Sequence, residues 1–198
     1  PTHVSINSAT HPSTALCEQV QTVSKNRFGR HCGIVSEEEM KQVNEALLIS
    51  FGLKEQWKPC GQKDPNYYRG GLYYVRTSDV LGSGQEVGRP AVIVSNDTGN
   101  KYSTIAEVVY LAAQKKDNLP THVPINSATY PSIALCEQVQ TVSKDRLGRC
   151  IGAVADEEME QINKALLFSF GLKESPKKGR QAKAQEKPEQ IKTKDVLA

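Results

Sequence analysis

Residues 88–112 read Gly-Arg-Pro-Ala-Val-Ile-Val-Ser-Asn-Asp-Thr-Gly-Asn-Lys-Tyr-Ser-Thr-Ile-Ala-Glu-Val-Val-Tyr-Leu-Ala, and this stretch decides the fold. Two apolar runs rich in β-branched residues, 91–94 and 105–111, flank a polar loop that contains Asn, Asp and Gly. Short, continuous apolar runs are typical of strands that are covered on both faces. The stretch therefore predicts two strands joined by a polar turn.

Arg89 stands at the mouth of the first strand, where the following Pro90 favours an extended backbone. We expect the turn to bring Ser103 and Thr104 back to the end of the sheet that holds Arg89. A fixed guanidinium beside hydroxyls can hold a phosphate. These three residues are therefore the predicted phosphate site. The alternative is that Arg89 pairs with a carboxylate at the rim and that the hydroxyls only belong to the turn.

Composition and cysteine pattern restrict the class of protein. The 198 residues are 38% hydrophobic and 24% charged, which is typical of a soluble globular protein. No apolar run approaches the roughly 20 residues that a membrane-spanning helix needs, and no secretory signal opens the sequence. Five cysteines, without a Cys-x-x-Cys pair, favour a reducing cytoplasm. The four histidines are scattered, so we expect no metal and no other cofactor.

An internal repeat dominates the sequence. Residues 1–55 align without a gap to residues 120–174, at an offset of 119, and 41 of the 55 positions are identical. Each copy predicts two strands followed by a helix. The expected strands are 2–6, 15–23, 121–125 and 134–142. The expected helix starts are Ser36 with Glu39, in a capping-box pattern, in the first copy and Asp156 in the second. The expected helix ends are Gly52 and Gly171.

The leading copy has no counterpart of residues 66–119 and therefore none of Arg89. We assign it no catalysis, and at about 55 residues its isolated core would be marginal. Two interpretations are open. The copy is either a loosely folded remnant of the duplication, which we favour, or a segment that docks where a second subunit would sit.

These patterns divide the chain into four parts. Residues 1–54 are the partial duplicate, 55–65 a linker, 66–172 the complete domain and 173–198 a basic tail. The tail carries eight Lys/Arg against four Asp/Glu, and its polar composition predicts disorder. It either adds salt-dependent, sequence-blind RNA affinity or only keeps the protein soluble. One interpretation of the whole protein is that it binds nucleic acid without sequence preference and does so through this tail.

Seven pieces of the sequence lie in the order found in a known family. They are Arg-Gly-Gly-Leu-Tyr-Tyr (69–74), Gly-Ser-Gly-Gln (82–85), Gly-Arg-Pro-Ala-Val-Ile-Val-Ser-Asn (88–96), Leu-Pro-Thr-His-Val (119–123), Cys-Glu-Gln-Val-Gln-Thr-Val (136–142), Asp-Arg-Leu (145–147) and Phe-Gly-Leu (170–172). On these pieces residues 69–172 resemble MazF/PemK-type toxins, the ribonuclease half of type II toxin–antitoxin pairs.

The resemblance implies a mainly β fold with α: an SH3-like (CcdB/MazF/PemK-type) curved β-barrel with a C-terminal helix. It implies a cytoplasmic homodimer, without membrane contact, that cuts single-stranded mRNA at short specific sequences and needs no metal. It also implies a cognate antitoxin that covers the RNA groove and takes part in DNA binding for autoregulation.

The resemblance also implies site residues. The family's Arg before Pro falls on Arg89. The family's catalytic hydroxyl follows a Ser-Pro; here Ser103 takes the Ser position, Thr104 the Pro position and Ile105 that of the hydroxyl. Gly71 and Gly84 replace residues that are often acidic in the family.

RNA is cut without metal when its own 2′-hydroxyl attacks the neighbouring phosphorus, which requires a base, an acid and positive charge against the phosphorane. Arg89 suits the charge role, and Ser103 or Thr104 would bind phosphate or aid proton transfer. The candidate RNA-binding residues are Gln85, Glu86, Tyr73, Lys115 and Gln138, with Tyr73 expected to stack on a base and Gln138 to contact a base edge. Core packing, strand pairing or a solvated turn are the plainer interpretations of these residues.

The altered family positions leave a second function open. A catalytically degenerate binding protein on the same fold would sequester antitoxin or bind a protein target such as gyrase.

Overall fold

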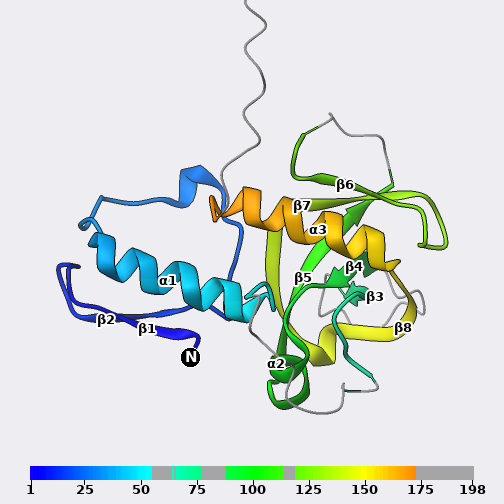
Figure 1. Ribbon diagram of the computed structural model, residues 1–198, viewed down its shortest axis with the longest axis horizontal. Coiled ribbons are helices and arrows are strands. Elements are labelled where there is room, and N and C mark those ends of the chain that lie inside the picture. Colours follow the sequence, from blue (N-terminus) through cyan, green and yellow to red (C-terminus); the bar gives the residue numbers. More distant parts are fainter. Residues whose placement is uncertain (55–63, 65, 77–87, 114–118, 173–198) are drawn as a thin grey trace, which may run out of the picture.

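The computed structural model describes residues 1–54, 64, 66–76, 88–113 and 119–172. The elements are β1 His3–Ile6, β2 Ser13–Leu16, η1 Lys25–Arg27, α1 Glu37–Ser50, β3 Gly71–Arg76, β4 Gly88–Ile93, α2 Asp97–Tyr102, β5 Ile105–Ala112, β6 His122–Ile125, β7 Ser132–Ser143, η2 Lys144–Arg146, β8 Leu147–Ala153 and α3 Asp156–Ser169, with η marking a 3-10 helix (Figure 1). The basic tail predicted at 173–198 lies outside the described residues.

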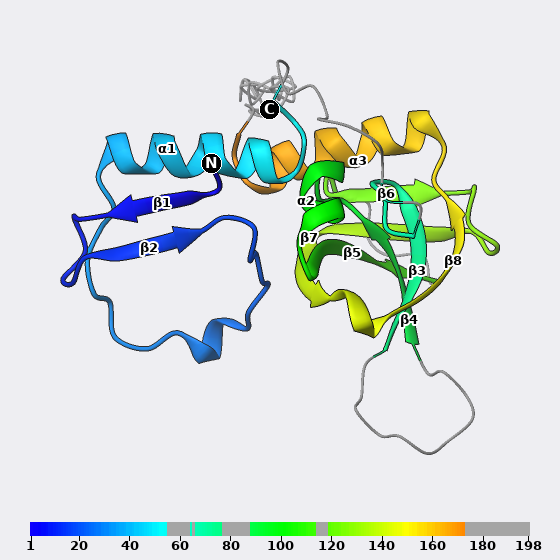
Figure 2. The ribbon, with the colours of Figure 1, turned by 90° about the horizontal axis from the view of Figure 1, so that it is seen from below.

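Six of these strands form one sheet in the order β6-β7-β5-β4-β3-β8, and every pairing in it is antiparallel. The register shifts between β3 and β8 and between β5 and β7, as happens where a sheet bends. Helix α3 packs against β6 and β7 (Figures 1 and 2). The expected fold, a mainly β curved barrel with a C-terminal helix, is confirmed.

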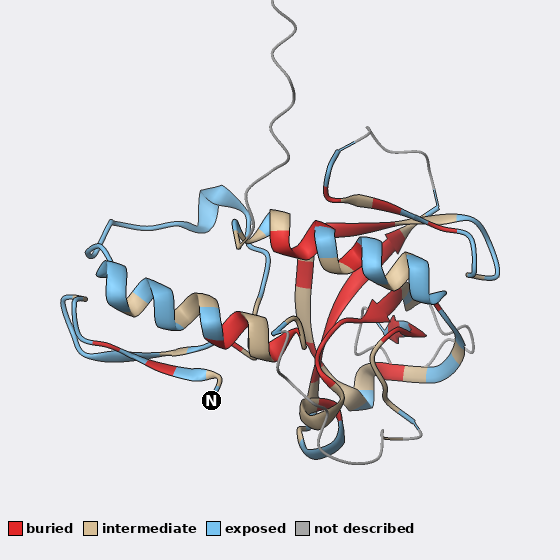
Figure 3. Ribbon diagram, viewed as in Figure 1, coloured by how far each residue is buried: buried red, intermediate tan, exposed pale blue. Residues whose placement is uncertain are grey.

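Both faces of the central strands are buried. Val92 and Val109, which face each other across β4 and β5, belong to one apolar cluster, whereas their chain neighbours Ile93 and Val108 belong to the other. Successive side chains of a strand point to opposite faces, so each strand feeds both clusters. This explains why apolar residues occupy consecutive positions of β4 and β5, and it confirms both strands predicted from residues 88–112 (Figure 3).

The polar stretch between β4 and β5 contains the short helix α2, where the sequence predicted only a turn. Asn96 is its N-cap, and its side chain accepts a hydrogen bond from the backbone N of Gly99 at 2.7 Å. Asn100 is fully buried and accepts a hydrogen bond from Ser95 Oγ at 2.6 Å. Asn favours both turns and helix N-caps, so its presence in the sequence did not separate the two.

At the offset of 119, β1 matches β6 and α1 matches α3 residue for residue. In each copy, a carboxylate at the equivalent position connects the start of the helix to the loop after the first strand. Glu39 accepts hydrogen bonds from the backbone N atoms of Asn7, Ser8 and Ser36, and Glu158 from those of Asn126, Ser127 and Ala155.

The predicted helix ends are mostly correct. Ser36 and Glu39 form the expected capping box, with the Glu39 backbone N donating to Ser36 Oγ at 3.3 Å. Asp156 is not the cap of the second helix: it is the first helical residue, and Ala155 stands at the N-cap. Gly52 and Gly171 follow the helices with φ of +60° and +66°, which glycine adopts without strain.

Among the described helices, none combines the length and the apolar character that crossing a membrane requires.

The two copies differ where the first one has no partner strands. The strand predicted at 15–23 is realised only as β2, which ends at Leu16, whereas β7 runs on to Ser143 because β5 pairs with it. Segment 28–34 forms no strand, since its counterpart β8 pairs with β3 and the first copy lacks a β3. Phe28 and Ile34 are therefore 71% and 79% exposed.

The first copy nevertheless packs against the complete domain. Cys17 and Phe51 are buried in the same apolar cluster as residues of β4, β5, β7 and α3. The Thr22 backbone N donates to the carbonyl of Val139, on β7, at 3.1 Å. The favoured interpretation of a loosely folded remnant is therefore wrong, because the two parts share one core.

Candidate nucleic-acid interface

Arg89 is the second residue of β4, and its side chain is exposed. Its guanidinium carbon lies 4.3 Å from the ring centroid of Tyr110, on the neighbouring strand β5. A guanidinium stacked on an aromatic face is held in place and keeps its hydrogen-bond donors free for a ligand. Within the described residues, Arg89 forms no ion pair.

Arg89 and Tyr110 line an open hollow of about 630 Å³, called the Arg89 pocket below. The other lining residues are Thr22 from the first copy, Glu137, Gln138, Gln140, Thr141 and Val142 from β7, and Arg146 from η2. Two guanidinium groups, two amides and three hydroxyl-bearing side chains thus share one hollow. Guanidinium groups suit phosphates, and amide and hydroxyl groups suit base and sugar edges.

Glu137 brings a carboxylate to the Arg89 pocket. Its Oε1 atom lies 3.3 Å from His122 Nε2 and 3.4 Å from Gln138 Nε2. Its Oε2 atom is buried and has no hydrogen-bond partner among the described residues. A buried carboxylate oxygen without a partner is costly, so this atom is available to accept a hydrogen bond from a ligand.

The expectation that the turn brings Ser103 and Thr104 next to Arg89 is wrong. In the antiparallel pair of β4 and β5, Ala91 faces Tyr110 and Ile93 faces Val108. Arg89 therefore lies at the end of the pair where β5 finishes, whereas Ser103 and Thr104 precede the start of β5. The two ends are separated by about eight strand residues, or roughly 25 Å. In a hairpin, residues at equal distance from the turn face each other, and Arg89 is far from the turn while the hydroxyls are next to it.

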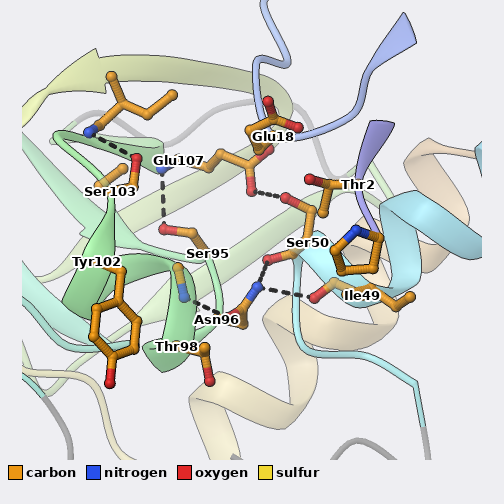
Figure 4. A pocket seen from close by; sticks show the side chains of 14 residues that line it. Thr2, Glu18, Ile49, Ser50, Ser95, Asn96, Thr98, Tyr102, Ser103 and Glu107 are labelled. Atoms are coloured by element: carbon orange, nitrogen blue, oxygen red, sulfur yellow. Dashed lines mark hydrogen bonds between the residues drawn. The ribbon is translucent and has the colours of Figure 1, made fainter. Parts of the chain in front are cut away.

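Ser103 lines a second hollow of about 380 Å³ between the first copy and the complete domain (Figure 4). Glu18 and Glu107 also line it, and no Lys or Arg does. Glu107 is 1% exposed and accepts a hydrogen bond from Ser50 Oγ at 2.8 Å. Burial raises the pKa of the Glu107 carboxyl to about 7. Two carboxylates in a hollow that no Lys or Arg lines suit a phosphate poorly.

The remaining predicted residues divide into three groups. Gln138 lines the Arg89 pocket. Tyr73 is 1% exposed and donates a hydrogen bond from its hydroxyl to the carbonyl of Asn66 at 2.7 Å, so the expectation that it stacks on RNA is wrong. Gln85, Glu86 and Lys115 lie outside the described residues.

The structure explains why position 71 is a glycine. A Cβ at position 71 would lie 2.8 Å from Tyr73 Cε2, which real Cβ atoms do not tolerate. The acidic side chain that the family often has at this position therefore does not fit beside Tyr73 in its present place.

Sequence reasoning missed Tyr110, Glu137, Gln140, Thr141, Arg146 and Thr22. One signal was available: Gln138 and Gln140 alternate with apolar residues along the predicted strand, so they share a face. That this face meets Arg89 depends on how β7 pairs with β5, which no local pattern specifies.

Comparison with known proteins places this chain in a family. The sequence model of the PemK-like, MazF-like toxins of type II toxin–antitoxin systems matches residues 1–51 and 68–170. The chain therefore belongs to this toxin family.

One relative is the Endoribonuclease MazF of Staphylococcus saprophyticus, which is 39% identical over 109 residues, or 52% of this chain and 91% of that protein. This relationship supports endoribonuclease activity. Two solved structures are also similar. An endoribonuclease from Mycobacterial species is 26% identical with a TM-score of 0.46 and covers 54% of this chain and 92% of that one. An endoribonuclease in complex with its cognate antitoxin, from Mycobacterial species, is 29% identical with a TM-score of 0.47 and covers 55% of this chain and 99% of that one.

Proposed function

We propose that this chain is the toxin of a toxin–antitoxin pair and cleaves single-stranded RNA at short specific sequences, without metal, in the Arg89 pocket. The observation that carries the proposal is the Arg89 guanidinium stacked 4.3 Å above Tyr110, in a hollow that also holds Arg146, Gln138 and Gln140. Membership of the toxin family supports the proposed cognate antitoxin, which would neutralise the chain by covering this pocket.

The proposed chemistry uses only the RNA and protein side chains. The ribose 2′-oxygen loses its proton and forms a bond to the adjacent phosphorus, while the bond to the 5′-oxygen breaks and that oxygen takes a proton from water, which leaves a 2′,3′-cyclic phosphate and a 5′-hydroxyl. Arg89 places positive charge against the phosphorane as negative charge develops on its oxygens. Because Arg89 is pre-positioned by Tyr110, this stabilisation needs little reorganisation in the transition state.

Proton transfer requires a group that accepts the 2′-hydroxyl proton. Among the described residues that line the Arg89 pocket, Glu137 is the one carboxylate, and its Oε2 atom has no protein partner. We assign the proton-accepting role to Glu137 in place of Ser103 and Thr104, which lie at the far end of β5. Within the part of the chain that the structure describes, no three His, Cys, Asp or Glu side chains gather to hold a metal.

Sequence recognition would come from the amides of β7. Gln140 donates from Nε2 to the carbonyl of Thr22 at 3.0 Å, which fixes its side chain and leaves Oε1 to accept from a base. Gln138 is next to Glu137 and lines the same wall. Amides read the donor and acceptor edges of unpaired bases, so these two residues are the proposed readers.

The test is digestion of a long unstructured RNA by the purified chain in excess chelator, followed by analysis of the fragment ends. We expect cuts at one short sequence, with cyclic phosphate and 5′-hydroxyl ends. Cleavage that requires added magnesium, or fragments with 5′-phosphates, would contradict the mechanism. Tight RNA or antitoxin binding without any cleavage would favour a catalytically degenerate binding protein, for which the absence of Ser103 and Thr104 from the pocket is the specific argument.

A further inference from the structure

We infer that the first copy occupies the surface on which a second copy of the complete domain would dock, so that one chain forms an internal pseudo-dimer with one Arg89 pocket. This inference rests on contacts between equivalent residues of the repeat and does not depend on the proposed RNA cleavage.

The first argument is a pair of reciprocal hydrogen bonds: a residue of each copy donates to the other copy, and the two donors and the two acceptors are equivalent positions of the repeat. Thr22 Oγ1 donates to the carbonyl of Val139 at 3.0 Å, and Thr141 Oγ1 donates to the carbonyl of Val20 at 2.9 Å. At the offset of 119, Thr22 is equivalent to Thr141 and Val20 to Val139. When residue i contacts j and the equivalent of j contacts the equivalent of i, the two surfaces are related by a two-fold axis.

A second argument is that two residues meet their own equivalents. Gln21 and Gln140 form an antiparallel bridge, and Phe51 stacks on Phe170 with ring centroids 5.1 Å apart. In a two-fold interface, only residues on the axis contact their own copies. Figures 1 and 2 agree with a two-fold arrangement, because α1 and α3 come from opposite sides of the molecule and approach each other with their C-terminal ends.

A third argument comes from the contacts that are not reciprocated. Asn96 donates from Nδ2 to the carbonyls of Ile49 and Ser50, each at 3.0 Å, and Ser50 is 2% exposed. Ser169, the equivalent of Ser50, is exposed. The first copy has no counterpart of Asn96 with which to cover Ser169, because it lacks residues 66–119. The interface is therefore half of a symmetric one: it has the reciprocal contacts near the axis, and the outer contacts on one side only.

The pseudo-dimer shapes the Arg89 pocket. Thr22 of the first copy lines the pocket beside its equivalent Thr141, and its carbonyl holds the Gln140 side chain at 3.0 Å. The first copy thus supplies one wall that a second subunit would otherwise supply. Since it has no equivalent of Arg89, a single pocket of this kind exists per chain. The homodimer that the resemblance implies is accordingly replaced by a monomer of this longer chain.

The test compares the mass of the full chain in solution with that of one variant, by light scattering after gel filtration. The wild-type chain should remain at its monomer mass of 21.8 kDa over a wide range of concentration. Phe51→Asp places a charge against Phe170 and should release the first copy, so that the exposed surface pairs with another chain and the mass doubles. Phe28→Asp is the matched control, because Phe28 is 71% exposed and should not change the mass. A dimeric wild type would overturn the inference, and so would a folded but monomeric Phe51→Asp chain.

A second measurement keeps the inference testable if Phe51→Asp does not fold. Paired residues of an antiparallel bridge have Cα atoms about 4.5–5.5 Å apart, which is within the range that a disulfide spans. The double variant Gln21→Cys with Gln140→Cys should therefore form an intrachain disulfide at monomer mass, and neither single variant should. Disulfide-linked dimers in the double variant would mean that the first copy docks on another chain, which contradicts the inference. Neither measurement involves RNA, so its failure is distinguishable from failure of the proposed cleavage.

Discussion

Replacing Glu107 by Gln should stabilise the protein, and only at neutral and alkaline pH. Glu107 is 1% exposed, and Ser50 Oγ donates to its Oε2 atom at 2.8 Å. Its Oε1 atom is buried without a hydrogen-bond partner among the described residues. Because burial removes water from the charged form, the pKa of the Glu107 carboxyl rises from 4.5 to about 7. The folded protein therefore keeps a proton that the unfolded chain releases.

The sign and size follow from this pKa. A carboxyl with a raised folded-state pKa contributes stability that is fully present below pH 4.5 and is lost as the pH rises to about 7. Each pKa unit is worth about 1.4 kcal/mol, so the loss at pH 8 is on the order of 3 kcal/mol. Gln stays neutral and can still accept the hydrogen bond of Ser50. We therefore expect Glu107→Gln to raise the free energy of unfolding at pH 8 by roughly 1–3 kcal/mol and to leave it nearly unchanged at pH 4.5.

The assay is urea denaturation of both proteins at pH 4.5 and pH 8, followed by circular dichroism. Taking the difference between variant and wild type removes the contributions of other carboxyls, which are the same in both proteins. Glu160→Gln, at an exposed position of α3, is the control and should show no such pH dependence. An equal effect of Glu107→Gln at both pH values, or a destabilisation at pH 8, would refute the reasoning that burial keeps this carboxyl protonated.

Three further predictions follow from the contacts. Ser36→Ala should lower the free energy of unfolding by about 1 kcal/mol in urea denaturation, because it removes the cap of α1; no loss would mean that Glu39 alone suffices, as Glu158 does beside Ala155. Tyr110→Leu should reduce the RNA cleavage rate several-fold, because it removes a cation–π contact with Arg89 that is worth about 1 kcal/mol. Tyr110→Phe keeps the ring and should keep the wild-type rate. Equal rates in the two variants would contradict the role of stacking. Ser103→Ala with Thr104→Ala should leave the cleavage rate unchanged, and a large loss would restore the site predicted from the sequence.

The strands could be predicted because their signal is local. The apolar runs that form β4 and β5 are visible in residues 88–112, and both strands lie where they were expected. Ser36 and Glu39 likewise contain the capping box within one turn of chain. In these places the sequence neighbours are also the spatial neighbours, so the pattern is sufficient.

The site was predicted only in part because its neighbours are distant in the chain. The sequence makes Arg89 a candidate through its position before Pro90. Its contact with Tyr110, and the presence of Gln140 and Arg146 in the same pocket, depend on strand pairing. The docking of the first copy is also non-local. Its residues are nearly the same as those of the second copy, yet they end in a different environment because the partner strands are missing.

The most direct test of the account is the single-turnover rate of RNA cleavage by Arg89→Ala in chelator, compared with Arg30→Ala as the control. Arg30 is exposed in the first copy and is not among the described residues that line the Arg89 pocket, so its loss should leave the rate unchanged. Loss of Arg89 should lower the rate by about 100- to 1,000-fold, the usual effect of removing a donor to transition-state charge. Cleavage by Arg89→Ala at the wild-type rate would contradict the assignment of this pocket as the active site.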